Sequence, residues 1–216
     1  MEIGRCLQLP GAMKNKYTQK KSSTKKLMSK LNFTPFPILT TERLILRCLE
    51  VSDDQQLFIL RSDNRVNQYL VRSKQKDIKE SRAFISKIND GINNNKWIYW
   101  AITLKESPKL IGTICLWNFS PKKNVAELGY ELDPAFQGKG IMNEASKIII
   151  EFGFQEIELN TIEAYTHISN NNSSKLLLRN NFKQDEEQKD KENRDNIIFT
   201  LTKQNWMQIK LNTTSH

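Results

Sequence analysis

Three strand-like segments joined by very short connections constrain the fold of this chain more than any other feature. Residues 96–104, 109–119 and 124–132 are rich in β-branched and aromatic side chains, and the turn sequences ESP and SPKKN separate them. Successive strands with such short connections pair in the antiparallel sense, because parallel neighbours need a crossover of about a dozen residues or more. The sequence therefore predicts an antiparallel meander at the centre of the fold.

One strand and two helices are predicted before this meander. The segment ERLILRCL at 42–49 is typical of a strand. Ser52 and Gln55 have the spacing of a capping box, so we expect a helix to begin there. An apolar stripe that ends near Gly91 indicates a second helix. The positions of that stripe are Ser81, Ile85, Ile88 and Ile92.

Helices and strands alternate after the meander. Apolar residues at helical spacing predict a helix over 143–154, with Lys147 and Glu151 as a solvated pair on its outer face. The remaining predicted segments are a strand at 161–168, a short helix at 173–182 and a strand at 196–202. We expect an α/β fold with a mixed sheet, in which an antiparallel front half leads into a parallel β–α–β back half.

Most of the formal net charge of +9 lies in the first 30 residues, which carry eight basic residues against one acid. Positions 31–216 are then near +2, so we do not expect nucleic acid as a partner of this part of the chain. We predict a single domain over 31–216. Residues 1–30 are expected to be a disordered basic tail, and Met28 could equally be the true start of translation.

Several classes of protein are not expected from this sequence. It has neither a secretory signal nor the ~18 successive apolar residues of a membrane helix, so we predict a cytoplasmic protein without a membrane partner. Cys6, Cys48 and Cys115 lack CxxC spacing, and His167 and His216 are the only histidines. We therefore expect neither disulfides nor a metal site.

Gly138 and Gly140 bracket Lys139, although the whole chain has only eight glycines. A P-loop would need a glycine at Asp133 and Ser or Thr after the lysine, and a dinucleotide fingerprint would need a third glycine at Asn143. Both phosphate-binding motifs are excluded by these positions.

What remains is a glycine-containing turn before a helix that begins near Ile141. The first N–H groups of a helix lack intrahelical partners and lie at the positive end of its dipole, so they stabilise an anion. Gly138 and Gly140 can adopt positive φ, which would let successive N–H groups surround a diphosphate, with Lys139 at the rim. Spacing alone leaves a plain strand-to-helix connection equally open.

The segment ELGYELDPAFQGKGIMNEA resembles the acetyl-coenzyme A loop of the GNAT N-acetyltransferases, whose pattern is Gln or Arg, two residues, Gly, one residue, and Gly or Ala. Gln137 and Gly140 occupy the first two places, and Met142 stands where Gly or Ala is usual. The resemblance is closest to the ribosomal-protein-alanine N-acetyltransferase group. It extends from LTTERLILR, near residue 39, to NIIFTLTKQNW.

A second motif of that family is Asn-x-x-Ser followed eight residues later by Gly-Phe. Asn170, Ser173, Asn181 and Phe182 stand at these places, and Asn181 is the other residue that tolerates the left-handed conformation of a helix C-terminus. The tyrosine that many members have four residues after the serine is Leu177 here, so this chain cannot use it.

The resemblance implies a GNAT fold, with a mixed, mostly antiparallel sheet flanked by helices. It also implies transfer of acetyl from acetyl-coenzyme A, the co-substrate, to a primary amine without a metal, by a monomer or homodimer. The acceptor it suggests is the N-terminal amine of a ribosomal protein. Small amines such as antibiotics or polyamines are the alternative acceptors, and a non-catalytic coenzyme A-binding or ribosome-associated module is an alternative of another class.

Cofactor-binding residues follow from the resemblance together with Gly129, because a glycine within a strand often marks a bulge or a close backbone approach. The pantetheine arm is expected to contact the backbone of Tyr130, Glu131 and Leu132, and the side chain of Asn170, which could instead be a turn residue. The diphosphate is expected at the following positions: Gln137, Gly138, Lys139, Gly140, Ile141, Met142 and Asn143.

Acetyl transfer needs a neutral amine and a proton for the leaving thiolate. Glu127 is the candidate general base, acting through a water, unless it is a strand carboxylate paired with a lysine. Glu131, four residues later on the same face, is a weaker candidate. Ser173 could bind or protonate the thiolate and contact the cofactor, or it could instead cap the helix that it opens.

Overall fold

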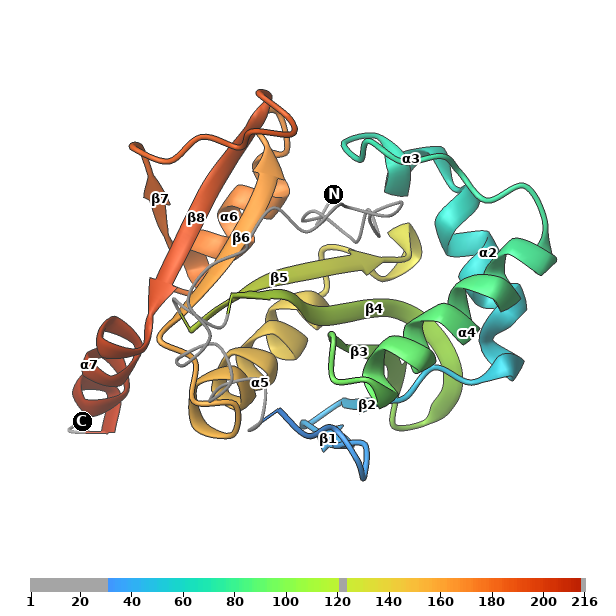
Figure 1. Cartoon of the computed structure of the whole chain (residues 1–216), viewed down its shortest axis with the longest axis horizontal. Coiled ribbons are helices and arrows are strands. Elements are labelled where there is room, and N and C mark those ends of the chain that lie inside the picture. Colours follow the sequence, from blue (N-terminus) through green and yellow to red (C-terminus); the bar gives the residue numbers. More distant parts are fainter. Residues whose placement is uncertain (1–30, 121–123, 215–216) are drawn as a thin grey trace.

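The computed structural model describes residues 31–120 and 124–214, and its core is one sheet with the strand order β1-β2-β3-β4-β5-β6-β8-β7 (Figure 1). The strands are β1 (Leu39–Thr40), β2 (Leu44–Arg47), β3 (Ile98–Leu104), β4 (Ser107–Ser120), β5 (Val125–Leu132), β6 (Thr161–His167), β7 (Lys183–Asp185) and β8 (Asn196–Thr202). All neighbours pair in the antiparallel sense except β5 and β6, which are parallel.

The predicted meander is confirmed as β3, β4 and β5, and the parallel β–α–β unit as β5, α5 and β6. β8 returns antiparallel to β6, so parallel pairing is limited to one neighbour. The short edge strands β1 and β7 were not predicted. They contain two and three residues, too few for a pattern of alternating burial.

The helical segments are η1 (Val51–Asp53), α2 (Asp54–Ser62), α3 (Asn64–Asn67), α4 (Ile78–Asn93), η2 (Pro134–Phe136), α5 (Ile141–Gln155), α6 (Asn171–Arg179) and α7 (Lys203–Thr214). Glu151 was predicted to pair with Lys147, but in the structure its carboxylate pairs with Lys210 of α7. Asn181 follows α6 at φ 64°, which confirms its predicted left-handed conformation and ends the helix before the predicted residue 182.

The predicted capping box at Ser52 and Gln55 is wrong. The backbone N–H of Glu50 donates to the carboxylate of Asp53 at 2.9 Å, and these two residues form the capping box of η1. The hydroxyl of Ser52 donates instead to Glu50 at 3.2 Å. A turn of 3-10 helix therefore precedes α2 and places the box two residues earlier.

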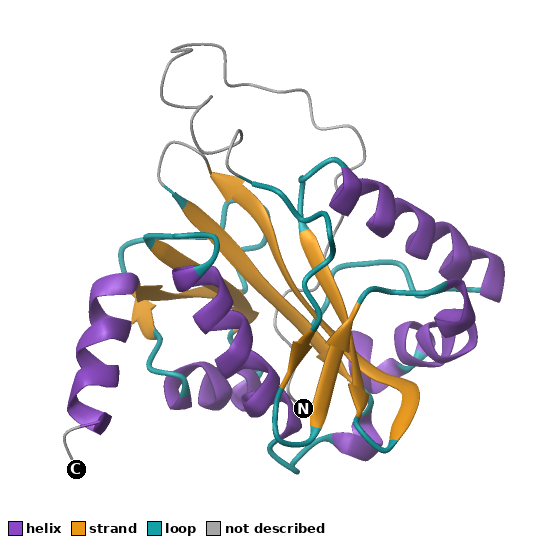
Figure 2. Ribbon diagram, turned by 90° about the horizontal axis from the view of Figure 1, so that it is seen from below, coloured by secondary structure: helices purple, strands orange, loops and turns teal. Residues whose placement is uncertain are grey.

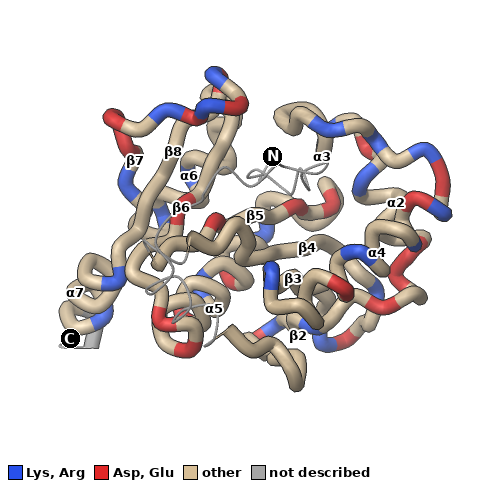
Figure 3. The backbone as a smooth tube through the Cα atoms, in the orientation of Figure 1, with Lys and Arg blue, Asp and Glu red and all other residues tan. Residues whose placement is uncertain are grey.

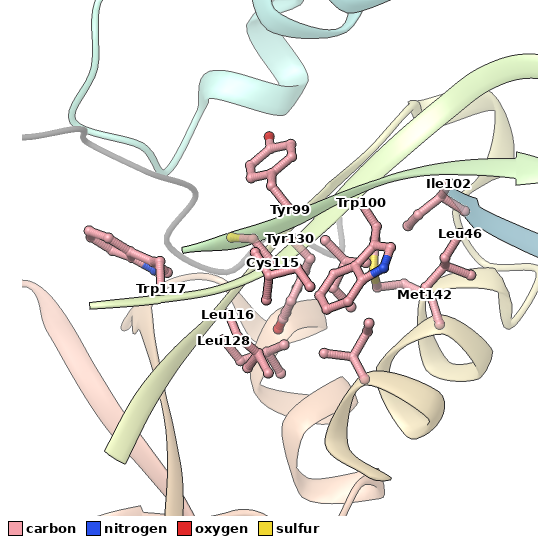
Figure 4. Packing of buried hydrophobic residues seen from close by; sticks show 14 of the residues in the cluster. Leu46, Tyr99, Trp100, Ile102, Cys115, Leu116, Trp117, Leu128, Tyr130 and Met142 are labelled. Atoms are coloured by element: carbon pink, nitrogen blue, oxygen red, sulfur yellow. The ribbon is translucent and has the colours of Figure 1, made fainter. Parts of the chain in front are cut away.

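Helices cover both faces of the sheet (Figure 2). On β3, Tyr99 and Trp100 point to opposite faces (Figure 4) because successive side chains alternate along a strand. The ring of Tyr99 lies 5.8 Å from that of Phe84 on α4, and the ring of Trp100 lies 5.4 Å from that of Phe152 on α5. Thus α4 packs on one face and α5 on the other.

Acidic and basic residues are interspersed along the described chain (Figure 3). No helix among the described residues is long and apolar enough to cross a membrane. Cys48 is half-buried and Cys115 is buried, and the sulfur of neither is part of a disulfide among the described residues. The predicted tail (1–30), with Cys6, and the terminal His216 lie outside the described residues.

Gly91 is buried in α4 because the indole of Trp97 packs directly on it. A Cβ added at Gly91 would lie 1.9 Å from the Trp97 ring, and the indole N–H is held by the carbonyl of Ile88 at 2.9 Å. The ring therefore cannot move aside without losing a hydrogen bond.

Gly91→Ala is accordingly expected to destabilise the protein by about 1–3 kcal/mol through overpacking. Helix propensity alone predicts a gain of about 1 kcal/mol for the same change. Urea unfolding would measure the difference, with the exposed α4 position Ser86→Ala as a control expected to change by less than about 0.5 kcal/mol. A Gly91→Ala variant as stable as the wild type would contradict this account of the packing.

Candidate functional site

The connection from β5 to α5 folds back on the end of β5. The side chain of Asp133 accepts from the N–H of Ala135 at 2.8 Å and caps η2. The side-chain amide of Gln137 donates to the carbonyl of Leu132 at 2.9 Å, and its backbone N–H donates to Pro134 at 3.3 Å. Gln137 therefore supports this turn through two hydrogen bonds, and Gly138 and Lys139, which follow it, are exposed.

Gly138 and Gly140 adopt the positive φ that the sequence analysis expected, at 74° and 76°. We call residues 137–143 the glycine loop. Gly140 is the N-cap of α5, and its carbonyl accepts the first helical bond from Glu144 at 3.0 Å. The N–H groups of 140–143 therefore have no acceptor within the helix.

The surroundings of the glycine loop fit an anionic group. Apart from its two chain neighbours, no residue in the described part of the chain has an atom within 4 Å of where a Cβ of Gly138 would be, so the backbone is open to a ligand on that side. The exposed ammonium of Lys139 lies 5.5 Å from the ring centroid of Phe136. These N–H groups and one mobile cation can together hold a diphosphate.

Met142, which departs from the family pattern, does not narrow the loop. Its side chain is fully buried, and Figure 4 shows it in the core below β3, near Leu46 and Trp100. Only the backbone of Met142 belongs to the surface of the glycine loop. Ile141 is buried in the same way, at 4% exposure.

The start of α5 is tied to the end of α6. The side-chain amide of Asn180 donates to the side-chain oxygen of Asn143 at 3.0 Å and to the carbonyl of Leu176 at 2.9 Å. This contact fixes the last residue of the glycine loop against the helix that carries the second predicted motif.

Strands β5 and β6 pair over only three positions, from Val125 with Thr161 to Glu127 with Glu163. Beyond this point β6 continues along β8 as far as His167, while β5 continues along β4. The β4–β5 ladder is regular through Gly129, so this glycine does not mark a bulge. The two strands part at the residues after Glu127.

Ser173 lies in the region where β5 and α6 face each other. Its hydroxyl is 2.8 Å from the hydroxyl of Tyr130, and both residues are fully buried. The expectation that Ser173 opens and caps the helix is wrong, because the N-cap of α6 is Asn170, which accepts from the Ser173 N–H at 3.2 Å. Asn170 thus holds Ser173 in place opposite Tyr130.

Glu127 is buried on the other face of β5, opposite Trp117 of β4 and Glu163 of β6. Its carboxylate accepts a long bond of 3.5 Å from the amide of Asn118. The hydroxyl of Tyr165 donates to Glu163 at 3.1 Å. Burial, followed by the charges of Glu163 and Glu127, raises the pKa of Tyr165, so this phenol stays protonated next to two carboxylates.

Glu131, the weaker candidate base, is committed to a buried ion-pair cluster. Arg61 of α2 and Arg72 contact its two oxygens at 2.8 and 2.7 Å, and the hydroxyls of Tyr99 and Thr113 each lie 3.2 Å from it. Burial would raise the pKa of Glu131, but the charges and hydrogen bonds of the arginines lower it to about 2. A carboxylate held ionised in this way is a poor proton acceptor near neutral pH.

Sequence reasoning missed the partners of these residues. Arg61 and Arg72 gave no local signal for pairing with Glu131, because they lie 70 and 59 positions away in the chain. Arg43 and Glu144, which meet beside the glycine loop across 101 positions, were missed for the same reason. The TTERL stretch, which contains Arg43, belongs to the segment that resembles the GNAT family, but the sequence suggested no role for Arg43.

Comparison with known proteins agrees with this arrangement. Residues 43–183 match the acetyltransferase (GNAT) domain family. The uncharacterised N-acetyltransferase YoaA of Bacillus subtilis (strain 168) is 30% identical over 150 residues, covering 69% of this chain and 85% of that protein. The ribosomal-protein-serine acetyltransferase of Escherichia coli (strain K12) is 35% identical over 74 residues, covering 34% of this chain and 41% of that protein.

Among solved structures, the ribosomal-protein-S5-alanine acetyltransferase of Vibrio fischeri superposes with a TM-score of 0.67 at 22% identity, covering 79% of this chain and 98% of that chain. At this level of identity, the superposition shows a common fold. The family match includes the glycine loop and α6, which are the two segments that meet at the candidate site.

Glu131→Gln is expected to lower the free energy of unfolding at pH 7 by about 3–5 kcal/mol, because two buried guanidinium groups lose their counter-charge. The folded pKa of about 2 lies below the ordinary value of 4.5. The stabilisation is therefore complete above about pH 4.5 and is lost as the pH falls towards 2.

Urea unfolding of wild type and variant between pH 7 and 3 measures this difference. It should be constant from pH 7 to about 5 and shrink below that. The control is Glu151→Gln, whose ion pair with Lys210 is about half-exposed and should contribute less than about 1 kcal/mol. A difference that does not change with pH would contradict the assignment of the charge to Glu131.

Proposed function

Because this chain belongs to the GNAT acetyltransferase family, we propose which amine it acetylates and what its site residues do. It is an acyltransferase with N-acetyltransferase activity, and acetyl-coenzyme A is the co-substrate of its family. The proposed acceptor is the N-terminal amine of a protein, in particular a ribosomal protein. The observation that supports the donor site most is the pair of left-handed glycines before α5, next to the point where β5 and β6 part.

The glycine loop is proposed to hold the diphosphate of acetyl-coenzyme A. The N–H groups of 140–143 lie at the positive end of α5, and Lys139 adds a charge at the rim. The pantetheine arm would follow β5 along Tyr130, Glu131 and Leu132, which lie beyond the three positions at which β5 pairs with β6. Asn170, at the start of α6, would face the same arm.

Glu127 is proposed as the general base. The bound donor supplies the acetyl group as a thioester, and the amine nitrogen forms a C–N bond to the carbonyl carbon as the C–S bond breaks. The proton that the amine loses passes to the carboxylate of Glu127 through a water. Glu127 lies where β5 and β6 separate, so its carboxylate is next to the proposed donor arm.

Ser173 is proposed to give a proton to the leaving sulfur. Leu177 stands where many family members have a tyrosine, but Tyr130 brings a phenol within 2.8 Å of the Ser173 hydroxyl. Tyr130 can then return a proton to Ser173, and both Tyr130 and Glu127 re-equilibrate with solvent after the products leave. This pair would supply the acid that the missing tyrosine supplies elsewhere.

The choice of a protein N-terminus rests on the similarity to the ribosomal-protein-serine acetyltransferase of E. coli, which covers a third of this chain. One observation favours a small cationic amine instead. Besides burial, the negative charges of Glu163, Glu127 and Asp190 raise the pKa of Tyr165, so this side of the sheet is acidic. A polyamine or aminoglycoside would gain more from three carboxylates than a peptide with one ammonium group.

An acceptor screen with thiol release as the readout separates these candidates. Peptides with free N-terminal alanine or serine, spermidine and an aminoglycoside are offered to the full-length protein, with N-acetylated peptides as blanks. Turnover of the free peptides above the small amines is expected. Turnover of spermidine or the aminoglycoside alone would replace the proposed acceptor by a small amine.

Gly140→Asp is expected to weaken acetyl-coenzyme A binding by more than about tenfold, because the new carboxylate adds a negative charge to the loop that is proposed to hold the diphosphate. Gly140→Asn is the matched control, since asparagine tolerates positive φ and carries no charge, and it should lose less affinity. Calorimetry measures both. An aspartate variant that binds as tightly as the wild type would remove the glycine loop from the donor site.

Glu127→Gln is expected to lower kcat by about 10²- to 10⁴-fold near neutral pH. The loss should shrink as the pH rises, because hydroxide from solvent can then take the proton that the amine loses as the C–N bond forms. The exposed Glu156→Gln is the control, with an expected kcat close to that of the wild type. A loss of equal size at every pH would argue against a base and for a structural role.

A further inference from the structure

Arg43, in the turn between β1 and β2, contacts the glycine loop at Lys139, and its Nη2 lies 3.5 Å from where a Cβ of Gly140 would be. Its Nη1 donates to the carbonyl of Lys139 at 3.0 Å. Its Nε and its backbone N–H donate to the two carboxylate oxygens of Glu144 at 2.7 and 2.8 Å. One arginine thus links a turn of the sheet edge to both the glycine loop and the first turn of α5.

The bond to Lys139 fixes the direction of the next N–H group. The Lys139–Gly140 peptide is trans, and in a trans peptide the carbonyl and the following N–H point in opposite directions. Because Arg43 holds the carbonyl on its own side, the N–H of Gly140 points to the other side. Glycine at 140 makes this arrangement dependent on Arg43, because glycine restricts the direction of the preceding peptide less than any other residue does.

Glu144 anchors the guanidinium in this position. Besides its two bonds with Arg43, its carboxylate accepts from the hydroxyl of Thr41 at 2.5 Å. Partial burial would raise the pKa of Glu144, but these hydrogen bonds lower it below the ordinary value, so it stays ionised. Arg43 also neutralises this carboxylate, which otherwise would lie in the first turn of the helix close to the proposed diphosphate.

We propose that Arg43 is a positioning residue for the acetyl donor. It holds the Lys139 carbonyl away from the open side of the glycine loop and thereby presents the Gly140 N–H to the diphosphate of acetyl-coenzyme A. The inference rests on the proposed function of this loop. It gives the TTERL stretch, which lies about 100 positions before the loop, a role in donor binding.

A lysine at position 43 would not bind Lys139 and Glu144 at the same time in this geometry. The planar guanidinium donates from Nε and Nη1 in fixed directions to two different acceptors, whereas an ammonium is a single point charge at the end of a flexible chain. Arg43→Lys is therefore expected to keep the ion pair with Glu144 while losing the bond to Lys139, and to bind the donor less tightly than the wild type.

The first test compares two donors. Arg43→Met should weaken acetyl-coenzyme A by roughly 10- to 100-fold, the effect of losing one charge-assisted hydrogen bond. S-acetylpantetheine, which has the thioester but no diphosphate, should keep its kcat/KM. Arg82→Met is the control, because it breaks a surface ion pair with Asp54 on the distant helices α4 and α2 and should leave both donors unchanged.

Equal losses for both donors, or no loss for either, would overturn the inference. If the wild type itself neither binds nor uses acetyl-coenzyme A, the proposed function fails, which is a different result. Thermal unfolding of the variants identifies general loss of structure, in which case Arg43→Lys, which keeps the ion pair, is used for the same comparison.

The second test separates positioning from charge and from direct contact. If Arg43 acted only by neutralising Glu144, the double variant Arg43→Met with Glu144→Gln would regain the affinity; we expect it to stay weak. If Arg43 acted only by touching the phosphates, the residual dipolar coupling of the Gly140 N–H in the free protein, which reports the direction of this bond, would be the same in wild type and Arg43→Met; we expect it to change. Recovered affinity or an unchanged coupling would contradict the proposal.

Discussion

The parallel pairing of β5 with β6 is the constraint on which the candidate site depends. The crossover between these strands places the N-terminus of α5 at the end of β5, as a β–α–β unit requires. The pairing then stops after three positions, beyond which β6 continues along β8 and β5 along β4. The part of β5 beyond this pairing leads to the glycine loop, and Tyr130 within it contacts Ser173 of α6.

The two sides of β5 divide the proposed chemistry. Side chains alternate along a strand, so Glu127 lies on the face covered by α2 and α4, while Tyr130 lies on the face of α5 and α6. A base for the amine and an acid for the sulfur therefore approach the space between β5 and β6 from opposite faces. Glu131, on the face of Glu127, is held by Arg61 and Arg72, and so fastens α2 to the strand.

Local patterns in the sequence were sufficient for much of the fold. The meander, the stripe of α5 and the left-handed conformations of Gly138, Gly140 and Asn181 follow from period, composition and glycine or asparagine chemistry. The capping box was predicted at the wrong residues. Glu50 and Asp53 have the same spacing as Ser52 and Gln55 two residues earlier, and local sequence does not distinguish the two pairs.

Contacts between distant positions could not be predicted in this way. Met142 departs from the family motif, and the sequence did not show that its side chain would be buried in the core. The bonds of Arg43 with Glu144, and of Ser173 with Tyr130, join segments 101 and 43 positions apart and leave no periodic trace. These contacts, more than the motifs themselves, determine how the glycine loop and α6 present their polar groups.

The central claim is that the backbone N–H groups of 140–143 hold the diphosphate of acetyl-coenzyme A. The most direct measurement is the change in amide chemical shifts when the full-length protein is titrated with coenzyme A and, separately, with pantetheine. The account predicts that the amides of Gly140, Ile141, Met142 and Asn143 shift with coenzyme A and much less with pantetheine. Shifts of equal size with both ligands, or shifts confined to other segments, would contradict it.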